Sequence, residues 1–333
     1  MPEVFLCLPE NEKKLGDNAE SPFIRPEILN RNRVNTLWGI DLGGTKIECA
    51  VLDATDKKSV IVRRRIPTEA DRGYEHILGQ IEKLVAQVTE ELGEKPRKIG
   101  FATPGTLDPV TQTMRGCNTV AMNGQPMKQD LEARLGVPCE LANDANCFAL
   151  AEALMGAGPA VAPDAQVVFG VILGTGVGGG VVINGKVWGG RQGIGGEWGH
   201  IFLDESGGPC YCGNTGCVEK VIAGPALQAY YESLAGEKRT LAEIVERRHT
   251  DPHASATIER LLDQFGKAIS IITNLLDPDV IVLGGGVSNV DLLYTEGLER
   301  AQKHVFTPSP DILVVRNELG DSAGVFGAAL LFA

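Results

Sequence analysis

The sequence predicts an α/β protein with two related lobes around a cleft. A strand, a glycine turn and a second strand occupy residues 39–53, and the same arrangement returns at residues 170–184, 131 positions later. Between and after these hairpins, short apolar runs alternate with longer stretches of helical periodicity, which is typical of α/β folds. The 333 residues are 43% hydrophobic, enough for a large core divided into about two domains. Two lobes that each present a glycine turn to one cleft indicate an internally duplicated nucleotide-binding fold.

We divide the chain into three parts. Residues 1–36 contain four prolines among scattered charges and are predicted to be an irregular extension. Residues 37–142 are expected to form a small α/β lobe, joined by a C-terminal helix within residues 318–333. Residues 143–317 are expected to form a larger α/β lobe.

The first glycine turn joins apolar runs at residues 37–42 and 47–53, and it consists of Gly43, Gly44, Thr45 and Lys46. Backbone N–H groups in such a turn can approach a phosphate, although a glycine turn is also compatible with an ordinary hairpin. It differs from the phosphate loop G-x-x-x-x-G-K-[ST], because a strand and not a helix follows it. An ungapped alignment of the two hairpins matches Gly39 with Gly170, Leu42 with Leu173, Gly43 with Gly174, and Val51 with Val182.

The other elements follow from periodicity and flanking signals. Residues 74–92 have the clearest helical pattern, with apolar side chains on one face. Further helices are expected near residues 131–135, 148–154, 220–234, 240–248, 253–276 and 321–332. Strands are expected at residues 60–67, 98–102, 138–142, 279–283 and 311–315; the fourth of these leads into the turn Gly284-Gly285-Gly286.

Asp144 is the strongest candidate for chemistry. It follows a predicted strand and precedes a predicted helix, the position at which α/β sheets present residues to a ligand. The alternative is that Asn143 or Asp144 simply caps that helix.

The stretch at residues 195–219 has the composition of a zinc site. His200, Cys210, Cys212 and Cys217 provide one imidazole and three thiolates, a set typical of a closed structural zinc. The C-x-C spacing is tighter than the common C-x-x-C, and three reduced cysteines or a disulfide remain alternatives. A metal that fixes these ligands also positions Glu197 and Glu219, two carboxylates suited to a hydroxyl-rich ligand.

Net charge and hydropathy restrict the classes of partner that we expect for this protein. A net charge of −12 argues against nucleic acid and anionic membranes, which favour clustered Lys and Arg. We find neither a run of about 18 apolar residues nor a signal-peptide pattern, and expect a cytoplasmic protein. The five remaining cysteines are scattered and are interpreted as buried and reduced.

Together these residues resemble the ROK family of bacterial sugar kinases, from about residue 37 to the end. The resemblance rests on residues 41–46, 143–146, 173–180, 195–219 and 279–286, and within the family it is nearest to the manno(fructo)kinases. It implies an actin-like, ribonuclease H-related ATPase fold that closes on a hexose and ATP.

The resemblance also implies roles for individual residues. Asp144 would be the general base, and the sugar contacts would be Gly105, Asn118, Asn143, Asp144, Glu197, His200 and Glu219. ATP and Mg²⁺ would be held by Asp41, Gly43, Gly44, Thr45, Lys46, Gly174, Thr175, Gly176, Gly178, Gly179, Gly284, Gly285 and Gly286. Zinc would be structural, and a homodimer is expected.

Three alternatives stay open at this stage. Glucokinase and N-acetylglucosamine or N-acetylmannosamine kinase differ from a fructokinase only in pocket details. A sugar-responsive repressor of the family needs a helix-turn-helix, for which residues 1–36 show no paired amphipathic helices. A non-catalytic ATP-binding protein of the actin-like fold would not need Asp144 beside sugar-binding carboxylates.

Overall fold

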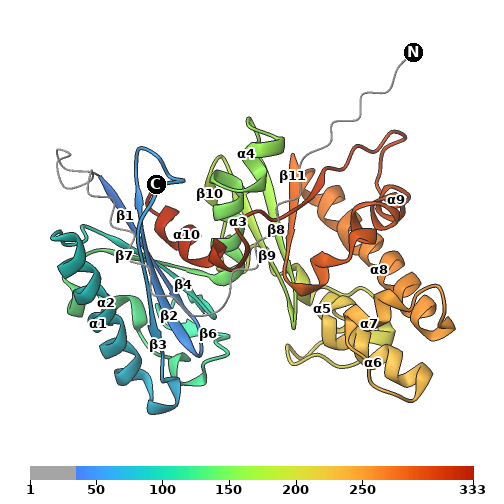
Figure 1. The fold of residues 1–333 in the computed structure, drawn as a ribbon, viewed down its shortest axis with the longest axis horizontal. Helices are drawn as coiled ribbons and strands as arrows, with labels where there is room; N and C mark the ends of the chain where they lie inside the picture. Colours follow the sequence, from blue (N-terminus) through green and yellow to red (C-terminus); the bar gives the residue numbers. More distant parts are fainter. Residues whose placement is uncertain (1–34) are drawn as a thin grey trace, which may run out of the picture. The chain divides into compact units, whose positions relative to one another are not determined.

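The computed structural model describes residues 35–333 and contains two five-stranded sheets (Figure 1). The extension predicted at residues 1–36 therefore lies outside the described residues, except for its last two positions. Of these, Thr36 already belongs to the first strand, one residue earlier than predicted.

The first sheet has the order β3-β2-β1-β4-β7. Strands β1, β2 and β3 are antiparallel neighbours, whereas β1, β4 and β7 run parallel. The strands are β1 (Thr36–Leu42), β2 (Lys46–Asp53), β3 (Val60–Pro67), β4 (Ile99–Thr103) and β7 (Cys139–Asn143), with a separate hairpin of β5 (Thr106–Leu107) and β6 (Met114–Arg115).

The second sheet repeats this order as β10-β9-β8-β11-β12. Strands β8, β11 and β12 are parallel, and β8, β9 and β10 are antiparallel neighbours, as in the first sheet. The strands are β8 (Val167–Leu173), β9 (Val177–Ile183), β10 (Lys186–Val187), β11 (Val280–Gly284) and β12 (Val314–Arg316). The predicted duplication is therefore confirmed, and the last strand lies later than the predicted 311–315.

The strand register corrects one detail of the alignment between the two hairpins. Trp38 pairs with Val51 in the first sheet, and at the equivalent place Phe169 pairs with Val181, not with Val182. The reason is the turn: four residues separate the last pair of the first hairpin, and three separate that of the second. The ungapped alignment therefore holds through the first strand and slips by one residue after the turn.

Ten α-helices occur among residues 35–333, and most follow the predicted pattern. They are α1 (Tyr74–Leu92), α2 (Met127–Leu135), α3 (Asp144–Leu154), α4 (Ala157–Val161), α5 (Val218–Ile222), α6 (Gly224–Ala235), α7 (Leu241–Glu246), α8 (Pro252–Leu276), α9 (Glu296–Gln302) and α10 (Ala323–Leu330). The single helix predicted at residues 220–234 is wrong. The chain is extended at Ala223 and starts a new helix there, because Pro225 is tolerated only in a first turn. Helices α4 and α9 were not predicted.

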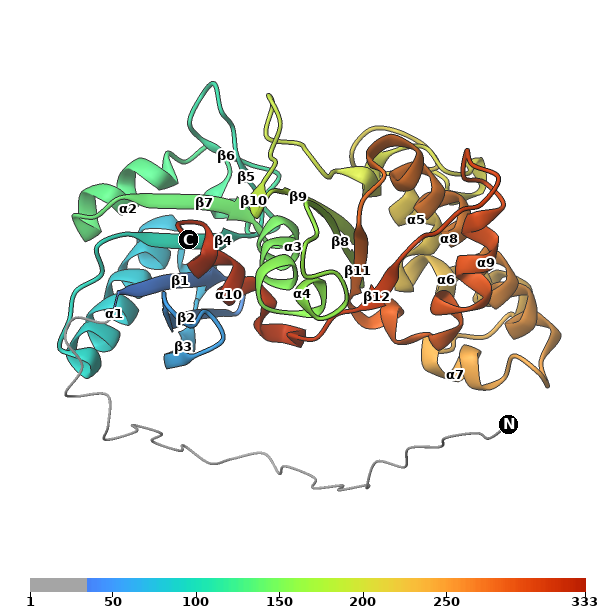
Figure 2. The ribbon, with the colours of Figure 1, turned by 90° about the horizontal axis from the view of Figure 1, so that it is seen from above.

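The helices form layers on the sheets (Figures 1 and 2). One core cluster joins the first sheet to α1 and α2, and another joins the second sheet to the helices α5 to α9. A third cluster lies between the sheets and contains side chains of α3 and α10. Figure 1 shows these two helices side by side in the centre.

The two central helices are exchanged between the sheets. Helix α3 follows the last strand of the first sheet but packs on β8 and β9, whereas α10 follows the last strand of the second sheet and packs on β1 and β4. Glycines permit the close approach: a Cβ on Gly170 would lie 2.6 Å from the Cβ of Ala149, and one on Gly327 would lie 1.8 Å from the carbonyl oxygen of Cys147. The predicted lobe boundaries near residues 142 and 318 fall in the segments that lead into these helices and stay predictions.

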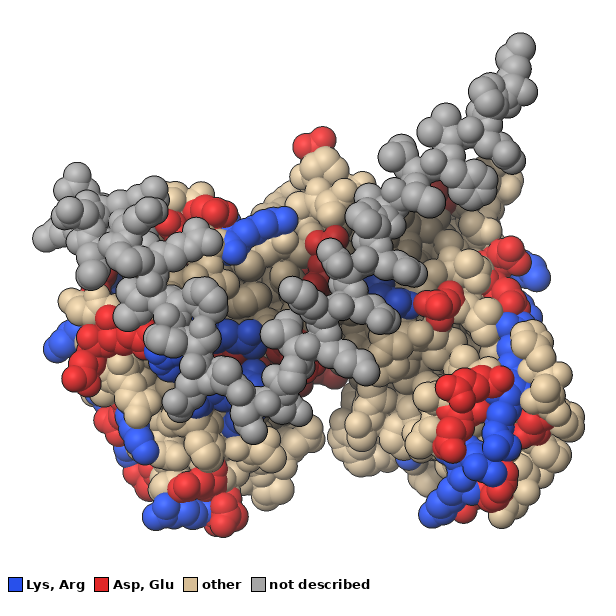
Figure 3. Space-filling view, in the orientation of Figure 1, with Lys and Arg blue, Asp and Glu red and all other residues tan. Residues whose placement is uncertain are grey.

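The surface of the described residues carries both signs of charge. Figure 3 shows acidic and basic side chains interspersed on one face of both lobes, and a notch between the lobes. Within residues 35–333, every helix is too short or too polar to cross a membrane.

Candidate active site

The predicted site residues gather at one edge of each sheet. Because β1, β4 and β7 are parallel, their carboxyl ends share an edge, which carries the turn at residues 43–46, Gly105 and Asp144. In the second sheet, β8 and β11 likewise bring the turns at residues 174–176 and 284–286 to one edge.

Asp144 is the first residue of α3 and does not cap it. The cap is Asn143, whose Oδ1 accepts a hydrogen bond from the Asn146 backbone N–H at 2.8 Å. Asp144 Oδ1 accepts one from the Ala145 N–H, also at 2.8 Å. The alternative that Asp144 is only a helix cap is therefore wrong.

The environment of Asp144 is that of a recessed carboxylate. The residue is exposed to solvent, yet the surrounding protein desolvates its carboxylate and raises its pKa. Carboxylates whose pKa is raised by desolvation are commonly found in active sites.

Asp41 is a second carboxylate of this site, at the end of β1. Burial, together with the negative charges of Asp144 and Glu48, raises its pKa to about 6, against the opposing charges of Lys46 and Arg65. Glu48 is almost fully buried and pairs with Arg65, with 2.6 Å between Nη2 and Oε2. Because Asp41 and Asp144 lie close together, this edge of the sheet is suitable for binding a cation together with the groups that the cation coordinates.

The first glycine turn is closed by its own backbone. The Gly43 N–H donates to the Lys46 carbonyl at 3.0 Å, and the Thr68 hydroxyl donates to the Gly43 carbonyl at 2.7 Å. Gly44 and Thr45 are exposed at the tip. The tip is therefore held in place and open to a ligand.

The second glycine turn lies against the turn at residues 284–286. Gly174 donates to the Gly176 carbonyl at 2.9 Å, and Thr175 is exposed. Gly285 has a φ of 84°, and a Cβ on it would lie 2.4 Å from the Leu173 carbonyl oxygen. Only glycine permits this approach, so the two turns predicted to bind the nucleotide are neighbours.

Gly178 and Gly179 differ from the other predicted nucleotide contacts. Both lie inside β9 and not in the turn. Gly179 is buried, and a Cβ on it would lie 2.3 Å from the indole of Trp198, whose Nε1 donates to the Gly178 carbonyl at 3.1 Å. The structure thus gives this pair a packing role, and its contact with ATP stays a prediction.

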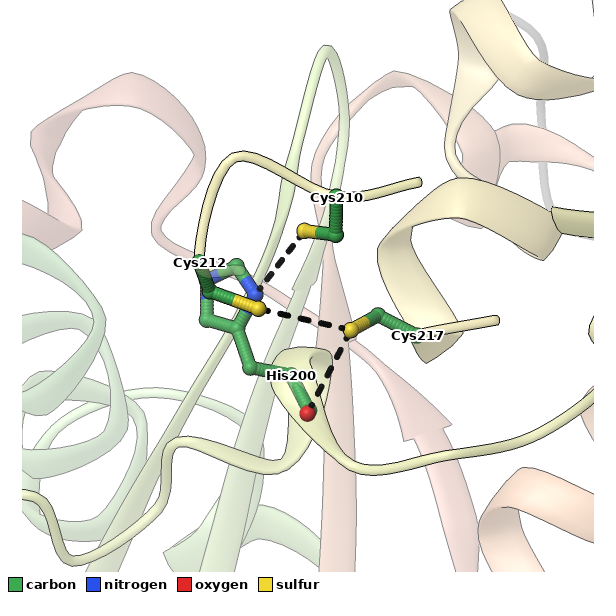
Figure 4. A group of neighbouring side chains, drawn as sticks. All are labelled: His200, Cys210, Cys212 and Cys217. Atoms are coloured by element: carbon green, nitrogen blue, oxygen red, sulfur yellow. Dashed lines mark hydrogen bonds between the residues drawn. The ribbon is translucent and has the colours of Figure 1, made fainter. Parts of the chain in front are cut away.

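The four predicted metal ligands converge (Figure 4). One ligand atom from each of His200, Cys210, Cys212 and Cys217 lies within 4.8 Å of all the others. The Cys212 and Cys217 sulfurs are 3.6 Å apart, and Cys210 Sγ is 3.6 Å from His200 Nδ1. Ligands on a tetrahedral zinc are separated by about 3.5–3.8 Å, given Zn–S of about 2.3 Å and Zn–N of about 2.0 Å. The residues therefore fit zinc, whereas the sulfur separation is far from a disulfide bond.

Two glycines shape this ligand loop. Gly213 has a φ of 91° and its N–H donates to the Cys210 carbonyl at 3.0 Å, which closes a tight turn around Tyr211 and Cys212. Gly216 has a φ of 72°, and its N–H donates to the Gly208 carbonyl at 2.9 Å. These left-handed positions allow three cysteines on one short loop to face one point.

The carboxylates beside the loop reach toward the sheet edges. Glu219 Oε2 accepts a hydrogen bond from the Val177 N–H at 3.1 Å, directly after the second glycine turn. Burial raises the pKa of Glu197, and the charges of Asp144 and Glu219 add to this, against those of His200 and Arg115. Glu197, Glu219 and Asp144 thus form one electrostatically linked group.

Two predicted sugar contacts, Gly105 and Asn118, lie between strands β4 and β7 of the first sheet in the sequence. Gly105 packs closely on β6, since a Cβ there would lie 2.5 Å from the Arg115 carbonyl oxygen. Asn118 is exposed, and the backbone before it is fixed by Asn123, which accepts from the Cys117 N–H at 2.8 Å and donates to the Cys117 carbonyl at 3.0 Å.

The sequence analysis missed two residues of this site. Arg115 pairs with Asp108, with 3.2 Å between Nη1 and Oδ2, and its charge acts on Glu197; no sequence motif marks it. Tyr211 places its hydroxyl 2.9 Å from His200 Nε2. Its position between two ligands of the C-x-C motif was the available signal.

The duplicated sheets and the carboxylates at their facing edges define a protein of the actin-like ATPase fold. The chain belongs to the ROK family, whose model matches residues 37–333. It is 35% identical over 305 residues to the N-acetyl-D-glucosamine kinase of Vibrio vulnificus, covering 88% of this chain and 98% of that one.

Solved structures agree with this assignment. A ROK hexokinase from Thermus thermophilus superposes with a TM-score of 0.79 at 32% identity, covering 89% of this chain and 97% of that one. A ROK glucokinase from Streptomyces griseus, in complex with glucose and AMPPNP, has a TM-score of 0.69 at 28% identity, covering 89% and 98%.

Proposed function

We propose that this ROK protein is a sugar kinase that transfers a phosphoryl group from ATP to a hydroxyl of a hexose, with Asp144 as the general base. The observation that carries the proposal is the convergence of Asp144 with Asp41 on one side and with Glu197 and Glu219 on the other. The similarity to named sugar kinases over nearly the whole chain supports the same class of reaction.

The proposed role of each residue follows from its position in the site. Glu197, Glu219, Asn118 and Asn143 orient the sugar, so that its attacking hydroxyl faces Asp144. Asp144 accepts the proton of that hydroxyl as the new O–P bond forms, and its raised pKa makes its carboxylate a better base than an aspartate with the ordinary pKa. Such positioning, together with charge stabilisation, accounts for most of the catalysis of phosphoryl transfer.

The glycine turns are the proposed nucleotide contacts. Backbone N–H groups at the tips of the turns, those of Gly44, Thr45, Thr175 and Gly176, would bind phosphate oxygens, because the N–H groups of Gly43 and Gly174 already donate within the turns. Residues 284–286 would lie along the adenosine. Asp41 would hold Mg²⁺, which neutralises phosphate charge when bound. A solved relative in complex with AMPPNP supports ATP as the donor.

Zinc has a structural role in this proposal. A site with four protein ligands leaves no position for a reacting water, so we assign the metal no chemical step. By fixing His200 and Cys217, the metal would hold in place the adjoining segments that carry Glu197 and Glu219.

N-acetylglucosamine is the first candidate substrate, because the Vibrio vulnificus relative named above is an N-acetyl-D-glucosamine kinase. Fructose or mannose, which the sequence motifs favoured, is the second. A panel of N-acetylglucosamine, N-acetylmannosamine, glucose, fructose and mannose in a coupled ADP-release assay with ATP and Mg²⁺ ranks them by kcat/KM. Absence of turnover on every sugar, with folded protein, would contradict the proposed function.

Asp144→Asn tests the general base. Removing such a group typically lowers the rate by about 10²–10⁴-fold. We expect a loss of kcat in at least that range, with the circular dichroism spectrum unchanged. Turnover near that of the wild type would refute the role of Asp144.

A further inference from the structure

A glycine-rich loop, residues 188–196, leads from β10 to Glu197, one of the carboxylates proposed to contact the sugar. The loop is closed at its base, because the Gly195 N–H donates to the Gly189 carbonyl at 2.8 Å. The Glu197 N–H donates in turn to the Ile194 carbonyl at 3.2 Å. The position of Glu197 therefore depends on where this loop lies.

The tip of the 188–196 loop lies against the β5–β6 hairpin. A Cβ on Gly193 would lie 3.1 Å from the Thr106 Cγ2 atom and 3.4 Å from the Leu107 carbonyl oxygen. Gly193 also has a φ of 69°, which favours glycine at this position. Figure 2 shows the loop that follows β10 next to the hairpin. Two segments from different halves of the fold thus meet at this point.

Arg115 of β6 joins the loop to the hairpin. Its Nη2 donates to the Gln192 carbonyl oxygen at the loop tip, and its Nη1 lies 3.2 Å from Asp108 Oδ2 on its own hairpin. Asp108 is itself fixed, because its Oδ1 accepts hydrogen bonds from the Val110 and Thr111 N–H groups, both at 2.9 Å. A guanidinium has several N–H donors in one plane, so it can hold two acceptors at once in a defined geometry.

The exposure of this ion pair indicates a local role. The Arg115 side chain is 42% exposed, and ion pairs this accessible contribute little to the stability of a fold. Among the described residues, the 188–196 loop also supplies no side chain to the core clusters. The loop can therefore leave the hairpin without disturbing either core, and Arg115 determines where the loop lies.

The hairpin and the loop both lead into segments proposed to contact the sugar. Gly105 packs on the backbone of β6, since a Cβ on it would lie 2.5 Å from the Arg115 carbonyl oxygen. Asn118 follows soon after Arg115, and Glu197 follows the loop. Burial raises the pKa of Glu197, and the nearby charge of Arg115 opposes this rise. The contact at Arg115 thus joins the two sides of the proposed sugar site.

We propose that Arg115 is a positioning residue, which holds the 188–196 loop on the β5–β6 hairpin and thereby keeps Glu197 in register with the sugar contacts of the first sheet. The inference rests on the proposed function. A sugar gripped from both sides needs both sets of contacts in place at once, so it binds more weakly when the site must first be ordered.

Cleavage by trypsin measures the contact between loop and hairpin without sugar or ATP. Arg191 is exposed in the loop and provides the bond that trypsin cuts. The matched control for Arg115→Ala is Arg64→Ala on β3, because Arg64 also pairs with a carboxylate, that of Glu91, donates to a backbone carbonyl and has a side chain that is 46% exposed.

Mass spectrometry follows the rate of cleavage after Arg191. We expect this rate to rise about 5- to 10-fold in Arg115→Ala, because the loop is released more often once the hydrogen bond is lost. Arg64→Ala should be cut there at the rate of the wild type. An unchanged rate in Arg115→Ala, or an equal rise in both variants, would overturn the inference.

Calorimetry without nucleotide then measures the affinity for the sugar that ranks first in the panel, and kinetics give kcat and both KM values. We expect Arg115→Ala to raise the dissociation constant and the KM for the sugar about 5- to 10-fold, with the KM for ATP and the circular dichroism spectrum unchanged. Arg115→Lys keeps the charge but holds two acceptors less well, so it should recover only a small part of the loss.

Unchanged sugar affinity in Arg115→Ala would overturn the inference. Full recovery in Arg115→Lys would do the same, because the charge beside Glu197 would then be sufficient. An equal rise in the KM for ATP would point to a general structural defect and also count against it. If the wild type binds no sugar of the panel, the proposed function falls together with the sugar-positioning role, whereas cleavage after Arg191 still decides whether Arg115 holds the loop.

Discussion

Asp41→Asn should make the protein more stable and less active at the same time. Burial and the charges of Asp144 and Glu48 raise the pKa of Asp41 from 3.8 to about 6, so the ionised carboxylate destabilises the folded state. At about 1.36 kcal/mol per pKa unit, this shift is worth roughly 3 kcal/mol at pH 8, which is an upper value because polar surroundings respond to the charge. Asparagine keeps the shape of the side chain and removes that charge.

The stability gain of Asp41→Asn should depend on pH, in a direction set by the raised pKa of Asp41. A carboxyl with a raised pKa contributes stability in its protonated form, which is fully present below about pH 3.8 and is lost as the pH rises through about 6. The advantage of Asp41→Asn should therefore be largest at pH 8 and fall to about half at pH 5. A gain of this size corresponds to an increase in Tm of about 4–6 °C.

Thermal unfolding followed by circular dichroism at pH 8 and pH 5 measures this difference, with the exposed Asp164→Asn as a control expected to show no gain. An Asp41→Asn protein that is no more stable than the wild type at pH 8, or whose advantage grows at pH 5, would refute the argument. Kinase activity should fall in the same variant, because Asp41 is the proposed magnesium ligand.

Two further predictions concern the ligand loop and the central helices. Cys212→Ser should lose zinc, lower the Tm and weaken sugar binding together, because one ligand of a four-ligand site is removed; elemental analysis and calorimetry check this, and a zinc-free variant with unchanged sugar affinity would show that the coupling is overstated. Gly327→Ala should destabilise the protein by about 1–3 kcal/mol or more in urea unfolding, because the new Cβ would lie 1.8 Å from a carbonyl oxygen of α3. The control Gly79→Ala, on α1 with open space around it, should be neutral or stabilising by about 0.5–1 kcal/mol; equal effects in both would contradict the packing argument.

Local patterns determined which elements were predicted well. Helix α1 matches its predicted bounds because its apolar face alternates regularly with polar positions. The break at Ala223 was not predicted because apolar periodicity continues across it, and Pro225 in the first turn of α6 is the only local signal of the new helix. The one-residue slip between the two hairpins depends on turn length, which an ungapped comparison ignores.

The residues of the candidate site also differ in whether a short local motif marks them or only the fold brings them together. Asp144 and the four metal ligands stand in short motifs, so the sequence was enough to select them. Arg115 reaches Glu197 across 82 positions of the chain, and only the fold brings them together. The sequence does not decide whether Asn143 or Asp144 caps α3. The hydrogen bond from the Asn146 N–H to Asn143 Oδ1 decides it.

The exchange of α3 and α10 between the sheets has a consequence for synthesis. The inner face of the first sheet is covered by residues 323–330, so the first half of the chain leaves the ribosome with this one face of its sheet uncovered until residue 330 has emerged. We therefore expect a nascent chain stalled before residue 323 to remain bound by chaperones and sensitive to protease. Neither half should fold as a separately expressed fragment, whereas co-expressed halves should restore each other by supplying the missing helix.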